Sequence, residues 1–144
     1  MGLKEAKFVW MDGKFIRWKN AKVHVMTHSL HYGSAVFEGI HSYKTNEYIS
    51  IFRLDDHIER LFKSANAISM KLKFTRQQLK DAIKKTARVN NIGDGYIRPL
   101  AFYGYAGIGV YPKGVPTNIA IAAIPWGHFY SSDLRVMTSG YRRT

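Results

Sequence analysis

The order in which hydrophobic periodicity changes along the chain limits the folds that this sequence can adopt. Runs rich in β-branched and aromatic residues lie within residues 8–52, apolar residues at helical spacing lie within residues 54–93, and strand-like runs return from residue 95. Strands, then two helices, then more strands are typical of α+β proteins. The sequence therefore predicts an α+β fold in which two main helices pack on an antiparallel sheet.

The first predicted strands form two hairpins and a less regular connection. Residues 8–10 and 15–18 flank a Met-Asp-Gly-Lys turn, and an Asp-Gly pair in this position is a strong hairpin signal. Residues 38–43 and 48–52 flank a second predicted turn at residues 44–47. Between the hairpins we expect a short strand over residues 22–26 and a loop with a helical turn over residues 27–39.

Two amphipathic helices are predicted in the middle of the chain. Asp55 and Asp56 lie near the start of the first helix, where carboxylates interact favourably with the positive helix end, and Thr75 is the expected cap of the second. Asn90-Asn91 and Gly93 indicate its end. The apolar positions are Leu54, Ile58, Leu61, Phe62, Ala65 and Ile68 in the first helix, and Leu79, Ala82, Ile83 and Ala87 in the second.

Three further strands are predicted after the helices. Residues 96–103 form the first, in which Pro99 indicates an edge position or a break because proline donates no backbone hydrogen bond. The glycine- and proline-rich residues 104–116 predict a loop. Residues 118–124 are almost continuously apolar and predict a strand buried on both faces. A last strand begins at Leu134–Thr138, and because nothing follows it we expect the chain to be part of a longer protein.

Charge and cysteine content narrow the classes of function. The 22 Lys and Arg residues outnumber the 10 Asp and Glu residues, so nucleic acids, acidic surfaces and anionic small molecules are possible partners. The basic residues are scattered rather than gathered in a stripe, which argues against nucleic acid. The chain has no cysteine, no signal-peptide pattern and no apolar run long enough to span a membrane. We expect a cytoplasmic protein that does not act on membranes.

Tyr96 and Arg98 are the first candidate site residues. They lie two apart on a predicted strand and therefore point to one face of the sheet. A guanidinium offers a two-pronged fork to a carboxylate, and the phenol adds a donor. The simpler interpretation is an exposed arginine stacked on a tyrosine.

Arg60 is the second candidate. His57, Arg60 and Ser64 lie on one side of the first predicted helix, where Arg60 can bind a phosphate. A solvated helix face is the alternative. We expect the guanidinium groups of Arg60 and Arg98 to face a common hollow.

Two other clusters are weaker candidates. His24, His28 and His31 have a spacing that can place imidazoles on one helical face, but the segment lacks helical periodicity and we expect no metal site. Gly104, Gly107 and Gly109 are followed by a strand rather than a helix, so we interpret them as turn residues and not as a dinucleotide-binding loop.

Several ordered motifs resemble the branched-chain amino acid aminotransferases. Residues 31–40 resemble the H-Y-G-x-x-V-F-E-G-I motif of that family, and residues 96–100 its Y-I-R-P-L strand. Residues 57–65 resemble its H-x-x-R-L-x-x-S-A helix, and Pro125-Trp126-Gly127 also matches. The resemblance extends from about residue 8 to the end of the chain. In one respect the chain departs from the family, because Phe129 stands where a tyrosine is common, with Tyr130 beside it.

The resemblance implies a fold-type IV enzyme that uses pyridoxal 5'-phosphate. Residues 1–132 would form its small N-terminal domain, and residues 133–144 would begin its large domain. The implied reaction transfers the amino group of L-leucine, L-isoleucine or L-valine to 2-oxoglutarate, giving branched-chain 2-oxo acids and L-glutamate. The lysine that binds the cofactor covalently is expected beyond residue 144, so the chain alone is expected to be inactive and to hold no catalytic residue.

The resemblance also assigns roles to individual residues. Arg60 would bind the cofactor phosphate, and Arg98 would bind the distal carboxylate of glutamate or 2-oxoglutarate. The residues implied in the substrate pocket are Phe37, Tyr96 and Trp126, with Tyr32 and Val110 lent across a dimer interface. The family resemblance thus implies a homo-oligomer built from dimers.

Two alternatives remain. One is a related enzyme of the same fold, such as an amine or D-amino acid transaminase. The other is a non-catalytic module that uses its basic surface to bind anions or nucleic acid.

Overall fold

A single antiparallel sheet organises the described part of the chain, which comprises residues 4–126 and 136–141 of a computed structural model. Its strand order is β2-β1-β7-β6-β4-β5, and β3 pairs with β6 in line with β4. In chain order the elements are β1 (Phe8–Met11), β2 (Lys14–Arg17), the 3₁₀ turn η1 (Trp18–Asn20), α1 (His28–Tyr32), β3 (Ala35–Phe37), β4 (Ile40–Lys44), β5 (Ile49–Ile51), α2 (Leu54–Ala67), α3 (Arg76–Val89), β6 (Gly95–Tyr103) and β7 (Thr117–Pro125).

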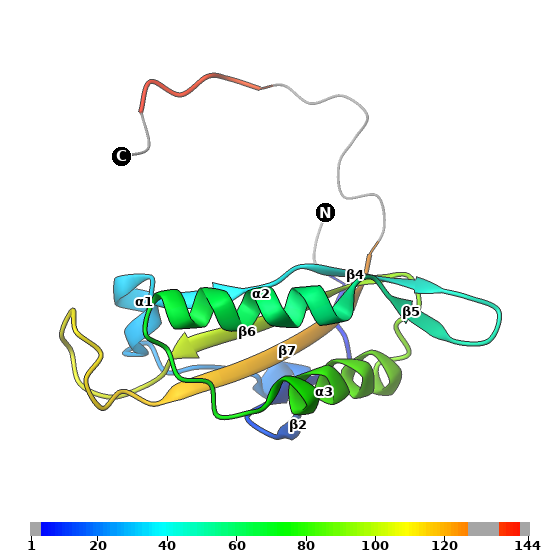
Figure 1. Cartoon of the computed structure of the whole chain (residues 1–144), viewed down its shortest axis with the longest axis horizontal. Helices are drawn as coiled ribbons and strands as arrows, with labels where there is room; N and C mark the ends of the chain where they lie inside the picture. Colours follow the sequence, from blue (N-terminus) through cyan, green and yellow to red (C-terminus); the bar gives the residue numbers. More distant parts are fainter. Residues whose placement is uncertain (1–3, 127–135, 142–144) are drawn as a thin grey trace.

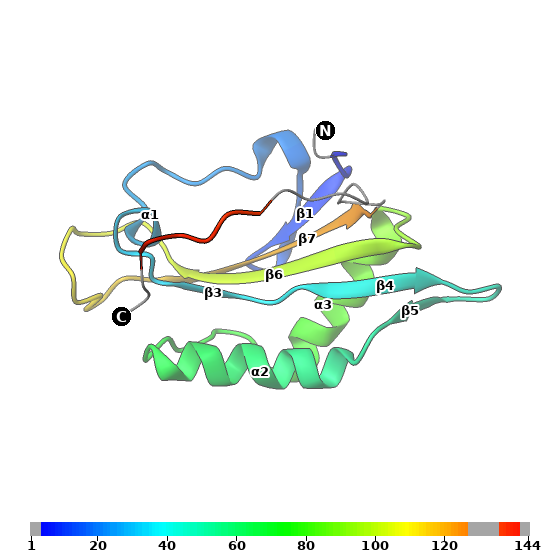
Figure 2. The ribbon, with the colours of Figure 1, turned by 90° about the horizontal axis from the view of Figure 1, so that it is seen from above.

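The two long helices cover one face of the sheet. Figure 1 shows α2 and α3 in front of β6 and β7, and Figure 2 shows that no helix of similar length covers the opposite side of the described strands. This arrangement confirms the predicted α+β fold with an antiparallel sheet and two main helices. The face turned away from the helices is called the open face below.

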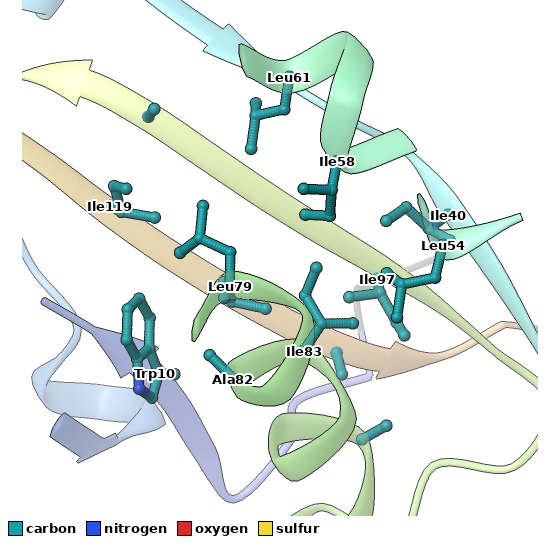
Figure 3. Packing of buried hydrophobic residues seen from close by; sticks show 14 of the residues in the cluster. Trp10, Ile40, Leu54, Ile58, Leu61, Leu79, Ala82, Ile83, Ile97 and Ile119 are labelled. Atoms are coloured by element: carbon teal, nitrogen blue, oxygen red, sulfur yellow. The ribbon is translucent and has the colours of Figure 1, made fainter. Parts of the chain in front are cut away.

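The core lies between the sheet and the two helices. Apolar side chains of α2 and α3 interdigitate with those of β6 and β7 (Figure 3). The helical contributors include Ile58, Leu61, Leu79 and Ile83, and the strand contributors include Ile97, Ile119 and Ile121. Each of these side chains is at most 1% exposed. Full burial of one such aliphatic side chain stabilises the fold by roughly 1.5–3 kcal/mol.

The predicted hairpins and helices are confirmed, except that Ile68, expected on the apolar side of the first helix, follows the end of α2 and is 39% exposed. Asp12 and Gly13 have φ of 46° and 96° in the turn between β1 and β2, a conformation that suits an Asp-Gly pair. The turn between β4 and β5 spans residues 45–48. At α3, the Thr75 hydroxyl accepts from the Gln78 backbone N–H while the Gln78 side chain accepts from the Thr75 N–H, which is a capping box.

The connection between the two hairpins differs from the prediction. Residues 22–26 do not form a strand, because the backbone turns there and the Thr27 N–H donates to the His24 carbonyl at 2.9 Å. The expected helical turn is α1. Residues 35–37, predicted as loop, form β3, whose pairing with β6 is a long-range contact that local sequence does not encode.

Pro99 lies in the middle of the sheet, so its predicted edge or break position in β6 is wrong. Its side chain is buried in the core, and β6 continues on both sides of it. The ladder breaks in the neighbouring chain segment instead. There, β3 ends at Phe37 and β4 begins at Ile40, and the Glu38 N–H donates to the Pro99 carbonyl at 3.0 Å. Proline is tolerated because the strand opposite it is interrupted.

The prediction that residues 118–124 are buried on both faces is also wrong. Burial alternates along β7, with Ile119, Ile121 and Ala123 against the helices and Ala120 and Ala122 half-buried on the open face. Alternation is the usual pattern of an antiparallel sheet with one covered face. The sequence of β7 looks continuously apolar because alanines occupy the half-buried positions on the open face.

The end of the chain lies largely outside the described residues. The predicted strand at Leu134–Thr138 is described only from residue 136, and residues 136–138 are exposed and not in a strand. The predicted domain boundary between residues 132 and 133 falls outside the described residues. Among the helices in the described part of the chain, none is long and apolar enough to cross a bilayer.

Asn90 provides a test of how the N-terminal segment is attached to the core. Its Oδ1 accepts from the N–H groups of Lys7 and Phe8 at 3.0 and 2.8 Å, and its Nδ2 donates to the carbonyls of Phe8 and Thr86. We predict that Asn90→Ala lowers the free energy of unfolding by about 2–3 kcal/mol, because part-buried backbone donors lose their acceptor. Urea titration would measure this change. Asn66→Ala, at an exposed position of α2, should change stability by less than about 0.5 kcal/mol, and equal losses in both variants would contradict the prediction.

Candidate functional site

The pairing register places the candidate residues on different faces of the sheet. Directly opposed residues of neighbouring antiparallel strands share a face, and the faces alternate along each strand. Tyr96 is paired with His41 and Ile124, and Arg98 with Ala122. All of them lie on the open face, because the intervening Ile97 is completely buried against the helices.

Four of the predicted site residues come together on the open face. Arg98 Nη2 donates a hydrogen bond to Tyr96 Oη at 2.7 Å, and its guanidinium carbon lies 4.2 Å from the centroid of the Phe37 ring. The indole of Trp126 stacks on the Tyr96 ring with centroids 4.5 Å apart. Phe37, Tyr96, Arg98 and Trp126 thus form one group, which we call the open-face cluster.

The cluster combines a cationic fork with apolar walls. The only side-chain hydrogen bond of Arg98 to another described residue uses one N–H of Nη2, so one edge of the guanidinium, made of the second Nη2 N–H and a neighbouring nitrogen, can bind both oxygens of a carboxylate. Because Tyr96 Oη accepts from Arg98, its own proton is free to be donated to the same carboxylate. The aromatic rings beside it can contact an apolar side chain.

Two neighbours of the cluster were not singled out as site residues from the sequence. The His41 ring lies edge-on to Tyr96 and Trp126, with centroids 5.7 and 5.9 Å away. Gly39 leaves space that Tyr96 occupies, since a Cβ at residue 39 would overlap the phenol of Tyr96. Only the register between β4 and β6 reveals these contacts, and the sequence gives no direct signal of that register.

An apolar cavity of about 460 Å³ lies on the same face of the sheet. It is close to the open-face cluster, because Leu100 pairs with Phe37 and Ala122 pairs with Arg98. Its lining includes Val9, Met11, Trp18, Val23, Leu30, Ala35, Leu100, Phe102, Ala120 and Ala122. The open face therefore combines an apolar cavity with the guanidinium of Arg98 beside it.

Arg60 belongs to a separate group on the helix side of the sheet. Glu38, whose side chain is 3% exposed, accepts from Arg60 Nε at 2.7 Å and from Arg60 Nη2 at 2.6 Å. His57 Nδ1 lies 2.9 Å from the second oxygen of Glu38. The expected neighbourhood of His57 and Arg60 on one side of α2 is confirmed, and the residue that joins them is Glu38.

The electrostatics of this group favour the charged pair. Burial raises the pKa of Glu38, but the hydrogen bonds and charges of Arg60 and His57 outweigh burial and lower the pKa overall. The hydrogen bond and charge of Glu38 raise the pKa of Arg60. Arg60 is 65% exposed, and its Nη1 group has no partner among the described residues. A guanidinium held in this way can bind an anion such as a phosphate with its outer edge.

The register places Arg60 and Arg98 on opposite faces of the sheet, and the common hollow expected for them stays a prediction for the complete protein. Glu38 lies opposite the buried Pro99 on the helix side, whereas Arg98 is on the open face. The segment from Phe37 to Gly39 separates the two guanidinium groups. Alternation of faces along this segment explains the separation, because consecutive residues of an extended chain point to opposite sides.

Tyr32 and Val110 lie at the other end of β6. Ser29 of α1 donates to the Tyr103 carbonyl at 2.9 Å, which places α1 seven residues along the strand from Tyr96. The buried His28 holds this region together, since its Nε2 donates to the Gly109 carbonyl at 2.8 Å and its ring packs 4.5 Å from that of Tyr32. Tyr32 and Val110 are therefore not part of the open-face cluster, and they expose 36% and 82% of their surface.

The histidine cluster and the glycine-rich segment form contacts that stabilise local backbone structure. His24 accepts from the Met26 N–H, and His31 donates to the Val25 carbonyl. No group of three His, Cys, Asp or Glu side chains in the described ranges is arranged to hold a metal ion. Gly104 to Pro116 is a loop as predicted, closed by a hydrogen bond from the Gly104 N–H to the Pro116 carbonyl. Gly127, Phe129, Tyr130, Arg142 and Arg143 lie outside the described residues.

The sequence matches a known family over most of its length. The amino-transferase class IV family matches residues 35–144. A branched-chain-amino-acid aminotransferase of Pseudomonas aeruginosa is 39% identical over 140 residues, which cover 94% of this chain and 46% of that protein. The chain thus spans less than half the length of this curated relative.

Solved structures show the same similarity in three dimensions. The branched-chain amino acid aminotransferase of Escherichia coli superposes with a TM-score of 0.85 at 41% identity, over 89% of this chain and 42% of that one. A second branched-chain amino acid aminotransferase, from T.th., has a TM-score of 0.83 at 40% identity, over 85% of this chain and 42% of that one. The T.th. enzyme was solved in complexes with 4-methylvaleric acid and with N-(5'-phosphopyridoxyl)-L-glutamate.

Gly39 tests whether close packing fixes the open-face cluster. We predict that Gly39→Ala lowers the free energy of unfolding by about 1–3 kcal/mol, because the new methyl group displaces the Tyr96 ring. Urea titration of Gly39→Ala, Tyr96→Ala and the double variant would measure the coupling. The cost of Gly39→Ala should largely disappear in the Tyr96→Ala background, and an undiminished cost there would refute the steric explanation.

The lowered pKa of Glu38 predicts how the stability provided by its ion pair depends on pH. A carboxyl group with a pKa lower in the folded than in the unfolded state stabilises the fold above its unfolded pKa, and this stabilisation is lost as the pH falls through the folded pKa. We expect wild type to exceed Glu38→Gln in stability at pH 7 and the difference to shrink below about pH 4.5. Urea titrations from pH 7 to pH 3 would measure it. A difference that grows on acidification would contradict the assignment.

Proposed function

The chain belongs to the class IV aminotransferases, and from this premise we propose that the complete protein is a branched-chain amino acid aminotransferase. The proposed reaction transfers the amino group of L-leucine, L-isoleucine or L-valine to 2-oxoglutarate. The identity of about 40% to several branched-chain enzymes supports this choice within the class. Because the chain spans 42–46% of those relatives, the activity is proposed for the complete protein and not for these 144 residues alone.

The proposed cofactor is pyridoxal 5'-phosphate, which structures of homologous enzymes contain in related forms. Bound, it supplies the electron sink on which amino-group exchange depends. The residues on the helix side fit its phosphate, because Arg60 presents an unpartnered Nη1 group on a guanidinium whose inner edge is already fixed by Glu38. In this proposal Arg60 binds and orients the phosphate, as predicted from the sequence.

The open-face cluster is proposed to select the substrate. Phe37, Tyr96 and Trp126 would contact the branched apolar side chain, and the adjacent apolar surface would exclude water from it. Arg98 would bind the distal carboxylate of glutamate or 2-oxoglutarate through its free edge while Tyr96 donates its hydroxyl proton. The homologous T.th. enzyme has been crystallised with both an apolar acid and a glutamate derivative, which supports one pocket for two substrate classes.

The dimeric assembly expected from the sequence also stays a proposal. Tyr32 and Val110 are exposed and lie apart from the open-face cluster of their own chain, which is compatible with a role in the site of a second subunit. We propose a homo-oligomer built from dimers. A cytoplasmic location and the lack of a nucleic-acid partner remain predictions from composition.

One observation carries this proposal: a single arginine with a free bidentate edge lies among aromatic rings on an otherwise apolar sheet face. Such a site can accept either a carboxylate or an apolar group. No other described feature combines these two properties with the family assignment.

Arg98→Ala in the complete protein tests the proposed function. We predict that kcat/KM falls by about 10- to 100-fold for glutamate and 2-oxoglutarate, since a charge-assisted bidentate contact stabilises by roughly 1.5–3 kcal/mol, and by less than about fivefold for leucine. Steady-state kinetics with glutamate and leucine as amino donors and 2-oxoglutarate as acceptor would measure the three values. Arg88→Ala, which removes an exposed arginine of α3, is the matched control. Equal losses for glutamate and leucine in Arg98→Ala would reject the role of Arg98.

A further inference from the structure

We propose that Glu38 is a positioning residue that holds the Arg60 guanidinium in the orientation needed to bind a phosphate monoester. The proposal rests on the proposed role of Arg60 toward the cofactor phosphate and extends it to a residue with no direct contact to the ligand. Its basis is the geometry of the buried carboxylate, Arg60 and His57.

The contact fixes the guanidinium in two directions. Arg60 Nε and Nη2 each donate to a different oxygen of Glu38, at 2.7 and 2.6 Å. Two parallel hydrogen bonds define the plane of the group and its rotation within that plane. The remaining Nη1 group then points away from Glu38, toward the exposed side of the residue. Without Glu38, an arginine side chain that is 65% exposed would lose much of its fixed orientation.

The carboxylate is itself held rigidly. Glu38 lies between β3 and β4, and its backbone N–H donates to the carbonyl of the buried Pro99. His57 Nδ1 donates to the Glu38 oxygen that also accepts from Arg60 Nη2. The side chain of Glu38 is 3% exposed, so it has little room to adopt another rotamer. A rigid acceptor can transmit its own position to a long and otherwise flexible partner.

The other arginine ion pairs in the described part of the chain lack this feature. Arg53 pairs with Asp56, and Arg76 with Glu59, but both members of each pair are between 45% and 65% exposed. Exposed pairs of this kind contribute little and leave both partners mobile. Among the described ion pairs, that of Arg60 combines an exposed cation with a buried anion. This asymmetry is what a positioned anion-binding group requires.

If only its charge mattered, Glu38 would weaken the binding of a phosphate to Arg60, whereas positioning by Glu38 would strengthen that binding. Its negative charge lies within hydrogen-bond distance of Arg60 and opposes the approach of a phosphate. If neutralisation were its main effect, removing the charge would strengthen phosphate binding. If positioning dominates, removing it weakens phosphate binding. The two explanations therefore differ in the sign of the effect.

The experiment compares two probes that differ only in the phosphate group. Dissociation constants of pyridoxal 5'-phosphate and of pyridoxal are measured by absorbance titration of the cofactor-free complete protein. Their ratio reports the phosphate contribution, since covalent attachment of the pyridine ring is common to both. The variants are Glu38→Gln, which removes the charge, and Glu38→Asp, which keeps the charge but shortens the side chain. Glu59→Gln, on the same helix as Arg60 but paired with Arg76, is the matched control.

Positioning predicts that the preference for the phosphorylated probe falls about tenfold in both Glu38→Gln and Glu38→Asp and is unchanged in Glu59→Gln. An unchanged or increased preference in Glu38→Gln overturns the proposal. Should that variant fail to fold by circular dichroism, Glu38→Asp decides, and an unchanged preference there overturns it.

Arg60→Ala separates this inference from the function on which it rests. Loss of the phosphate preference in Arg60→Ala, with no loss in either Glu38 variant, rejects only the positioning role. A preserved preference in Arg60→Ala rejects the phosphate role of Arg60 and with it the positioning proposal. Loss in all three variants supports both.

Discussion

The contact between Pro99 and the segment opposite it organises both candidate groups. Pro99 has no backbone N–H to donate, and the strand beside it is interrupted between β3 and β4 at Glu38 and Gly39. Because faces alternate along an extended segment, Phe37 and Gly39 lie on the open face while Glu38 lies on the helix side. Phe37 therefore stacks on the guanidinium of Arg98, Glu38 binds Arg60, and Gly39 leaves space for the Tyr96 ring. The open-face cluster and the group around Arg60 both depend on this short interruption.

Separation of the two groups by the sheet has a chemical consequence. Arg60 is paired with a buried carboxylate, whereas Arg98 contacts aromatic rings and a phenol and has no anionic partner among the residues that the structure describes. A cation whose charge is already matched and whose geometry is fixed suits a ligand that stays bound. In the proposed function, a cation that lacks a counter-charge suits a substrate carboxylate that would exchange in each cycle.

Local patterns in the sequence were sufficient for the fold class and most elements. The Asp-Gly turn, the helical periodicity from Leu54 and the cap at Thr75 depend on neighbours a few residues apart, so each could be predicted. The position of Pro99, the strand β3 and the one-sided burial of β7 depend on which strands pair, and these predictions failed. The same limit applies to the site. The proximity of Tyr96 and Arg98 could be predicted because they are two residues apart on one strand. The contacts of Glu38 and His41, and the placement of Arg60 and Arg98 on opposite faces, depend on strand register and could not be predicted.

In the proposed function, the environment of Arg98 explains how one pocket would serve two kinds of substrate. With an apolar side chain in the pocket, the guanidinium can remain flat against the Phe37 ring and keep its hydrogen bond to Tyr96, so its desolvation is partly offset. With a second carboxylate present, the free edge of the guanidinium gains a bidentate partner while the group stays stacked on the Phe37 ring. An arginine surrounded by alanine would lack the first stabilising contact, and a lysine would lack the planar shape that permits both. Stacking on aromatic walls is therefore the feature that reconciles a half-buried charge with the proposed pocket for an apolar side chain.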